Sequence, residues 1–186
     1  MSTTSVDIDV DAIAPAAESK QNSNKIEAHR AGAEIFAGDS ILCKNKCIEL
    51  LEGLELPLGL LPLENLSEVG YNRSTDFVWL KQKKKTEHTF QKIGRLVSYG
   101  EEVTSFVENR RMKKITGVKS KELLIWITLS DMYVEDPMSG NITFKTPLGL
   151  SRNYPVSAFQ LASADVDAYN AQKQPVEAVV PSGEGN

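Results

Sequence analysis

The sequence predicts a mainly β fold, an antiparallel β-barrel or barrel-like sandwich of about eight strands with one or two N-terminal α-helices. Apolar and polar residues alternate in many short segments after residue 65, and polar turn residues separate these segments. Strands so short and so close are expected to pair antiparallel, because a parallel pair needs a crossover of a dozen or more residues. Closing the sheet would hide its edges from solvent. The 186 residues are 41% hydrophobic, which suffices for the core of one domain.

The helices are expected near the N-terminus, after an acidic tail. Residues 1–24 are polar and aperiodic, which predicts a disordered tail. Apolar residues at helical spacing predict a first helix over residues 25–37. Asp39 or Ser40 is expected to cap a second helix, which Gly53 ends. The apolar face of this second helix comprises Cys43, Cys47, Leu50, Leu51 and Leu54.

The strands follow an irregular apolar segment. Two prolines and a glycine exclude a regular helix over residues 56–63, so this segment is expected to run extended against the core. Strands are then predicted over residues 68–71, 76–82, 86–90, 93–99, 103–108, 111–115, 122–134, 141–146 and 154–159. In the fourth of these, Arg95 shares a face with Ile93, Val97 and Tyr99. The composition of residues 161–186 predicts a second disordered tail, so the domain is assigned to residues 25–160.

The most strand-like stretch is residues 122–134, which we expect to be the central strand. Alternate side chains of a strand point to opposite faces of the sheet. The row formed by Leu123, Ile125, Ile127 and Leu129 should therefore face the core. The other face begins apolar and becomes polar toward Ser130.

The net charge and the lack of targeting segments limit the classes of function that the sequence predicts. The net charge is −4, and the acidic residues gather at the two ends, so the domain itself is only slightly basic. A nucleic-acid partner is not expected, because such binders carry dominant, clustered basicity. The sequence shows no signal or transit peptide, no lipidation motif and no apolar run that could span a membrane, so we expect a cytoplasmic protein.

No catalytic constellation emerges from the motifs. Residues 38–42, Gly-Asp-Ser-Ile-Leu, resemble the nucleophile block of GDSL-type hydrolases. A serine nucleophile needs a histidine base that a third group orients, but the chain has only His29 and His88 and no Asp-x-x-His. We therefore interpret the motif as a helix cap. No catalytic residue is assigned, and a binding protein is expected rather than an enzyme.

The two cysteines do not indicate a metal site or a bound cofactor. Zinc needs four ligands, and neither a further cysteine nor a histidine pair accompanies Cys43 and Cys47. A reducing compartment also argues against a disulfide between them. Both side chains are expected in the core. Neither a metal nor a cofactor is predicted.

Two basic clusters lie near predicted strand ends. They comprise Lys81, Lys83, Lys84 and Lys85 in the first, and Arg110, Arg111, Lys113 and Lys114 in the second. One interpretation is that they are solvated edges, where cations block the association of sheets. The alternative is peripheral contact with an anionic membrane, since cations near such a surface are attracted to it.

A set of motifs resembles one plant family, the group called domain of unknown function 538. The motifs are Leu-Leu-Pro-Leu at 60–63, Glu-Val-Gly-Tyr-Asn at 68–72, Phe-Val-Trp-Leu-Lys-Gln-Lys-Lys-Lys at 77–85, Gly-Val-Lys-Ser-Lys-Glu-Leu-Leu-Ile-Trp at 117–126, Ile-Thr-Phe-Lys-Thr-Pro-Leu-Gly-Leu-Ser-Arg at 142–152 and Pro-Val-Ser-Ala-Phe at 155–159. The resemblance spans residues 32–160 and is strongest for the intracellular branch without a signal peptide. The long acidic ends depart from that branch.

The resemblance implies a compact barrel-like domain with an N-terminal helix and a role in growth or stress responses. It also brings two functional proposals that have been made for the family. One is a distant likeness to lipid-binding proteins of the bactericidal/permeability-increasing type, and the other is a carboxylesterase activity toward chlorophyll. It supplies no catalytic residues for this chain.

Three functions therefore remain open. The first is non-enzymatic binding of an apolar or amphipathic small molecule, a lipid or a pigment, in a barrel mouth. The residues that could line this site are Leu58, Leu60, Leu61, Phe77, Trp79 and Trp126, although the same residues could be plain core. The second is a carboxylesterase, and the third is a protein-interaction module whose partner the sequence does not identify. We favour the first.

Overall fold

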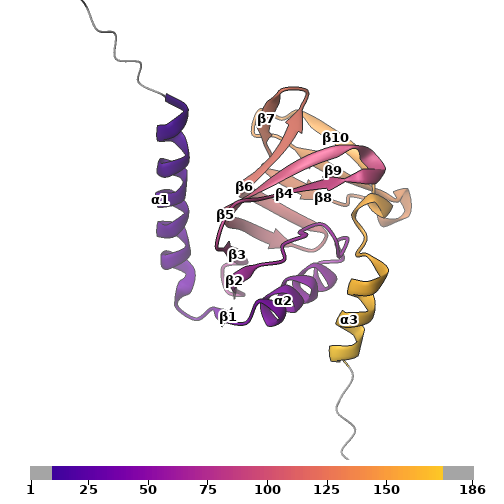
Figure 1. Ribbon diagram of the computed structural model, residues 1–186, viewed down its shortest axis with the longest axis horizontal. Coiled ribbons are helices and arrows are strands. Elements are labelled where there is room, and N and C mark those ends of the chain that lie inside the picture. The colour runs from indigo at the N-terminus through magenta and orange to yellow at the C-terminus, as the bar shows by residue number, and fades with distance from the viewer. Residues whose placement is uncertain (1–9, 174–186) are drawn as a thin grey trace, which may run out of the picture.

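A computed structural model describes residues 10–173 as one antiparallel sheet with three helices around it (Figure 1). The helices are α1 (Val10–Arg30), α2 (Ser40–Gly53) and α3 (Ser163–Lys173). The strands are β1 (Glu34–Ala37), β2 (Leu66–Asn72), β3 (Phe77–Gln82), β4 (Thr86–Phe90), β5 (Arg95–Glu108), β6 (Arg111–Glu122), β7 (Ile125–Thr128), β8 (Asp131–Tyr133), β9 (Asn141–Lys145) and β10 (Ser151–Pro155). Three short 3₁₀ helices, η1 (Gln91–Ile93), η2 (Pro137–Ser139) and η3 (Val156–Phe159), connect or follow strands.

The antiparallel prediction is confirmed, but the closed barrel is wrong. The ten strands follow the order β1-β2-β3-β5-β6-β8-β9-β10, with β4 added beside β5 and β7 beside β6. The strands at the two ends of this path, β1 and β10, do not pair with each other. Both are short, and β10 carries Arg152 and ends at Pro155, which are features that let an edge strand face solvent.

The long strands β5 and β6 bend where the register of their pairing shifts. The shift lies between the pairs formed by Tyr99 and Thr104 of β5. Gly117 of β6 sits at this bend with φ +79, and a Cβ there would lie 2.2 Å from the carbonyl oxygen of Glu102. Only glycine fits this position. On one side of the bend, residues 95–99 of β5 pair with β4, and residues 119–122 of β6 pair with β7. These pairings divide the sheet into two parts.

Alternate residues of β3 show what covers each face of the sheet. Val78 and Leu80 belong to the main core, whereas Phe77 and Trp79 pack with Ile26 of α1 in a second, smaller cluster. Figure 1 accordingly places α1 apart from α2 and α3. Trp79 also donates a hydrogen bond from its indole nitrogen to Glu68 at 2.7 Å.

The ion pair between α1 and β2 is partly buried. Arg30 lies 2.8 Å from the Glu68 carboxylate. Burial would raise the pKa of Glu68, but the hydrogen bonds from Trp79 and Arg30 outweigh burial and hold that pKa below its ordinary value. The carboxylate is therefore charged at neutral pH and ties α1 to the sheet.

The helix predictions are partly right. Asp39 caps α2 by accepting hydrogen bonds from the backbone nitrogens of Ile41 (2.9 Å) and Leu42 (3.1 Å), as expected. The helix predicted over residues 25–37 is wrong beyond residue 30. Residues 34–37 form β1 instead, because they pair with β2 residue by residue. Tertiary pairing here overrides helical spacing, which is a weak local preference.

Helices also occupy much of the two segments predicted as disordered tails. Residues 10–24 belong to α1, and buried Asn22 places this helix against the sheet. In the other tail, Tyr169 of α3 is buried and donates a hydrogen bond to Glu52 of α2 at 3.0 Å. Residues 1–9 and 174–186 of the predicted tails lie outside the described residues. None of the helices within residues 10–173 is long and apolar enough to cross a membrane.

The stretch predicted as the central strand is the clearest correction. Residues 122–134 are divided into the end of β6, a two-residue turn, β7 and β8. Leu123 and Leu124 form the turn and are 94% and 91% exposed. Leu123 has φ +54, which folds the chain back so that Glu122 faces Ile125. The sequence has no Gly, Asn or Pro at this point, so the usual sign of a hairpin turn is missing.

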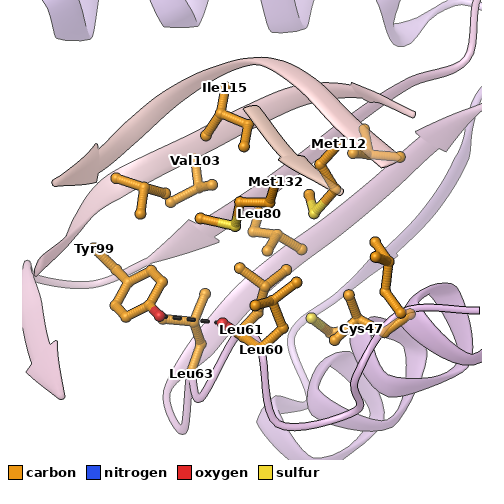
Figure 2. Close-up of a cluster of buried hydrophobic side chains, with 14 of the residues drawn as sticks. Cys47, Leu60, Leu61, Leu63, Leu80, Tyr99, Val103, Met112, Ile115 and Met132 are labelled. Carbon is orange, nitrogen blue, oxygen red and sulfur yellow. Dashed lines mark hydrogen bonds between the residues drawn. The ribbon is translucent and has the colours of Figure 1, made fainter. Parts of the chain in front are cut away.

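Residues 56–63 run against the core, as predicted, and Figure 2 shows how they are held. Leu56, Leu60, Leu61 and Leu63 are all buried. The hydroxyl of Tyr99 donates a hydrogen bond to the backbone oxygen of Leu60 at 3.1 Å (Figure 2). The backbone nitrogen of Gly59 donates to the oxygen of Phe159 at 2.8 Å. A Cβ on Gly59 would lie 2.7 Å from the backbone there, so glycine permits this close approach.

Candidate functional site: an apolar pocket between two hairpins

A pocket of about 320 Å³ opens at the end of the sheet where the β6–β7 and β9–β10 hairpins meet. Its volume falls within the range of small-molecule sites. The lining residues are Ile93, Arg95, Val97, Ser120, Glu122, Ile127, Leu129, Phe144, Thr146, Leu150, Ser151, Arg152, Tyr154 and Phe159. They come from η1, β5, β6, β7, β9, β10 and η3 and from the adjoining loops.

The floor of the pocket is aromatic. The ring of Phe144 lies 5.1 Å from that of Phe159 and 5.7 Å from that of Tyr154, measured between centroids. Phe144 and Phe159 are buried, and so are the neighbouring Val97 and Leu129. Such a floor offers dispersion contacts and a dry surface but few hydrogen-bonding groups. It suits the hydrocarbon part of a ligand.

The polar side of the pocket is an arrangement of two arginines around one glutamate. Glu122 Oε2 lies 2.8 Å from Arg95 Nη1, and Glu122 Oε1 lies 3.2 Å from Arg152 Nε. The side chain of Glu122 is 20% exposed, whereas that of Arg152 is 62% exposed. Two guanidinium groups against one carboxylate leave a net positive charge. A planar guanidinium can bind a carboxylate or phosphate through two parallel hydrogen bonds.

Strand register explains how these groups meet. Val97 of β5 and Ile127 of β7 are both opposite Ser120 of β6, so the three side chains share one face. Period two then places Arg95 and Glu122 on that same face. The signal was present in the sequence, because Arg95 alternates with apolar residues on one strand face. The strand order that brings Arg152 beside it could not be read from the sequence.

The six residues predicted to bind ligand lie elsewhere. Leu60 and Leu61 are in the main core, and Phe77 and Trp79 are in the cluster beneath α1. The partly buried Leu58 and the buried Leu61 also line a broader hollow of about 780 Å³ among α2, β4 and the loop before α3, which both polar and apolar side chains line. None of the six lines the pocket between the hairpins.

Trp126, the sixth of these residues, points away from the pocket because it follows Ile125 and precedes Ile127 in β7. Two cations lie near its ring, with Lys85 Nζ at 5.3 Å and Lys121 Nζ at 5.6 Å from its centroid. The tryptophan is only half-buried. It therefore marks the outer surface of the hairpin.

The structure distinguishes the two basic clusters. In the second cluster, Arg111 lies 3.1 Å from Asp131, and Lys113 lies 2.7 Å from Glu108. Arg110 is half-buried, and Lys114 lies 5.6 Å from the ring centroid of Phe106. In the first cluster, Lys83 and Lys84 are exposed and form no ion pair with the described residues, whereas Lys85 lies 3.5 Å from Glu87. Each cluster therefore keeps two cations without an ion pair to the described residues, and in the first cluster both of them, Lys83 and Lys84, are exposed.

The Gly-Asp-Ser-Ile-Leu segment at residues 38–42 and the two cysteines have structural roles. The Gly-Asp-Ser segment is the N-terminal cap of α2, as interpreted. His29 is distant from it, hydrogen-bonded to Thr75 at 3.0 Å and stacked on Phe77. Cys43 and Cys47 are buried in the core, as expected, and burial raises the pKa of Cys47 to about 12. In the stretch from residue 10 to residue 173, no three His, Cys, Asp or Glu side chains gather as metal ligands would.

Fold and pocket together define a protein with an open antiparallel sheet and an apolar hollow at one end of it. A comparison with protein families matches residues 47–160 to the family described as "Protein of unknown function, DUF538". The match covers more than half of the chain, so the chain belongs to this family, and the resemblance in the motifs is confirmed. No curated protein and no solved structure matches the chain significantly.

Proposed function

We propose that this protein binds a small amphipathic molecule that has an apolar chain or ring system and an acidic group. The observation that carries the proposal is the combination, in one pocket, of an aromatic and aliphatic floor with Arg95 and Arg152 at its side. The apolar part of the ligand would contact Phe144, Phe159 and Leu129. The acidic group would pair with the guanidinium groups.

Glu122 holds Arg95 and Arg152 at the side of the pocket through two ion pairs. The half-buried Arg95 needs a partner for its charge, and Glu122 supplies it while also pairing with the exposed Arg152. The exposed Arg152 can exchange this carboxylate for that of a ligand, because both geometries are equivalent for a guanidinium group. Glu122 would then tune affinity, since its negative charge competes with the ligand.

The test is displacement of a fluorescent long-chain fatty acid from the purified full chain. Oleate should displace the probe, and oleyl alcohol, which has the same chain without the charge, should displace it more weakly. Arg152→Gln should weaken oleate binding about tenfold, since a charge-assisted hydrogen bond contributes roughly 1.5–3 kcal/mol. Glu122→Gln should strengthen it.

Arg73→Gln is the matched control. Arg73 is 66% exposed and also forms an ion pair, with Glu34 at 2.7 Å, but it does not line this pocket. Its variant should bind oleate like the wild type. The proposal is wrong if no fatty acid displaces the probe, or if oleate and oleyl alcohol bind equally well to the wild type and to Arg152→Gln.

A further inference from the structure

Exposed apolar side chains are concentrated on two turns. Nine large hydrophobic side chains are exposed in the described part of the chain, and five of them lie in or directly beside the β6–β7 and β9–β10 turns. These five are Leu123 (94% exposed), Leu124 (91%), Ile125 (63%), Leu148 (90%) and Leu150 (67%). Single exposed hydrophobic residues are common in soluble proteins, but a cluster of five needs an explanation.

The two turns are neighbours in space although they are far apart in the sequence. Glu122 immediately precedes the first turn, and Arg152 closely follows the second. The ion pair between these two residues, at 3.2 Å, joins the hairpins. Both hairpins also line the same pocket. The β6–β7 hairpin projects at the top of Figure 1, away from α2 and α3, so its tip is free of the helices.

The backbone of the first turn is strained. Leu123 has φ +54 in a two-residue hairpin loop, where Gly, Asn or Asp is the usual residue. An L-residue with a branched side chain pays a steric penalty in this conformation. The folded chain thus presents two leucines to solvent in a turn that other residues would form more easily. Local strain combined with apolar exposure is typical of a segment whose function lies in an external contact.

Cations and an aromatic ring stand directly behind the apolar tip. Lys121 is paired with Trp126 in the β6–β7 register, one step back from Glu122 and Ile125. Lys85 covers Trp126 from the neighbouring β3–β4 turn, which also carries the exposed Lys83 and Lys84. Tryptophan favours the headgroup level of a bilayer, and lysine favours anionic headgroups. The order of apolar tip, tryptophan and cations matches the layers of an anionic membrane surface.

We propose that the β6–β7 and β9–β10 turns form a docking surface for an anionic phospholipid bilayer. The leucines and Ile125 enter the apolar layer, while Lys121, Lys85 and Arg152 contact the headgroups. Glu122, the acid beside the tips, is neutralised by Arg95 and Arg152 and does not repel the lipid. Docking of this kind does not require an occupied pocket. If the pocket also binds an amphipathic ligand, its mouth faces the membrane.

The experiment is sedimentation of the full chain with vesicles of phosphatidylcholine, alone or mixed with phosphatidylserine. The wild type should bind the mixed vesicles, and binding should weaken as salt screens the charges. The double variant Leu124→Asp/Leu148→Asp should bind at least tenfold more weakly. Both side chains are exposed, so the variant should fold normally. Met138→Asp is the matched control, because Met138 is 92% exposed in η2, away from both turns, and its variant should bind normally.

A second readout locates the contact on the molecule. Brominated lipids should quench the fluorescence of half-buried Trp126, whereas Trp79, which is fully buried beneath α1, should be unaffected. A Trp126→Phe variant separates the two signals. Quenching that persists in this variant would contradict the proposed orientation.

The remaining outcomes also decide the question. Equal vesicle binding by the wild type and the double variant would overturn the proposal. So would concentration-dependent dimerisation that Leu124→Asp abolishes, in the absence of vesicle binding, because the tips would then contact a second copy of the chain. Fatty-acid displacement in solution is measured separately. A double variant that fails to sediment but still binds oleate shows that the docking and ligand proposals stand independently.

Discussion

Residues 56–63 and residues 123–127 are both apolar stretches, yet they end in opposite environments. In the first, Leu60 is 1% exposed and Leu63 is 2% exposed, although the backbone there is irregular. In the second, Leu123 is 94% exposed and Leu124 is 91% exposed, although the sequence alternates like a buried strand. From the sequence pattern alone, residues 123–127 would be expected to be the more deeply buried of the two stretches.

The difference lies in what surrounds each stretch. Residues 56–63 lie between α2 and the sheet, and distant segments hold them through Tyr99 and Phe159. Residues 123–127 form the β6–β7 turn and the start of β7, and β7 pairs only with β6. Burial is thus a property of the neighbours, which are set by topology, and not of the stretch itself. Four experiments test this contrast, from the largest expected effect to the smallest.

The largest effect is expected from truncating a leucine in each stretch. Leu60→Ala should lower the free energy of unfolding by about 3 kcal/mol, since it removes a buried side chain and leaves a cavity. Leu124→Ala should change it by less than about 0.5 kcal/mol. Urea denaturation followed by circular dichroism measures both. Similar losses for the two variants would mean that the exposed stretch is covered in solution.

A smaller effect is expected from removing the hydroxyl group that holds the buried stretch. Tyr99→Phe leaves the backbone oxygen of Leu60 buried without its donor. An unsatisfied buried acceptor costs about 1–3 kcal/mol, so the variant should lose about 2 kcal/mol of stability. The same denaturation assay applies, with Tyr71→Phe as the control, because Tyr71 is only half-buried. Unchanged stability would imply that a water molecule replaces the hydroxyl.

Alkaline pH should lower the free energy of unfolding through the buried thiol of Cys47. Burial raises the pKa of Cys47 to about 12, so the thiol ionises in the unfolded chain before it ionises in the folded protein. Its contribution is complete below the unfolded pKa near 9 and declines as pH rises from there toward 12. Between pH 8 and pH 10 the wild type should lose about 1 kcal/mol more than Cys47→Ala. Parallel pH profiles for the two proteins would contradict this burial.

The smallest effect should have the opposite sign. Leu123→Asn places a residue that tolerates positive φ in the strained turn. The variant should therefore gain about 0.5–1 kcal/mol in stability. Thermal denaturation detects a gain of this size as a rise in Tm of a few degrees. A loss of stability would mean that Leu123 makes contacts in the folded protein that outweigh its strain.

The sequence predicted local features well and long-range ones poorly. The β2–β3 hairpin, β4 and the cap of α2 have strong local signals, such as the polar turn at residues 72–75 and Asp39 before an apolar face. The open sheet was missed because closure depends on whether β1 and β10 meet, which no local pattern encodes. The turn at Leu123 was missed because the residues there are not those that usually form turns.

The candidate site shows the same division. Arg95 on an apolar strand face was visible in the sequence, but Glu122 and Arg152 come from strands whose pairing was unknown. The ligand prediction named large apolar residues such as Phe77 and Trp79, which pack in the structure with Ile26 of α1. Composition indicates how much apolar surface a chain must bury. It does not say which of several apolar groups will line a hollow.

The contact between Gly59 and Phe159 has a consequence for folding. Most strands pair with a neighbour in the chain, so the sheet can assemble progressively as synthesis proceeds. Residues 56–63, however, emerge early and lack the Phe159 oxygen that Gly59 binds until the end of the domain has been made. During that interval a leucine-rich segment has no cover on one side. We expect the nascent chain to need a chaperone at this stage, and a chain truncated before residue 156 to aggregate.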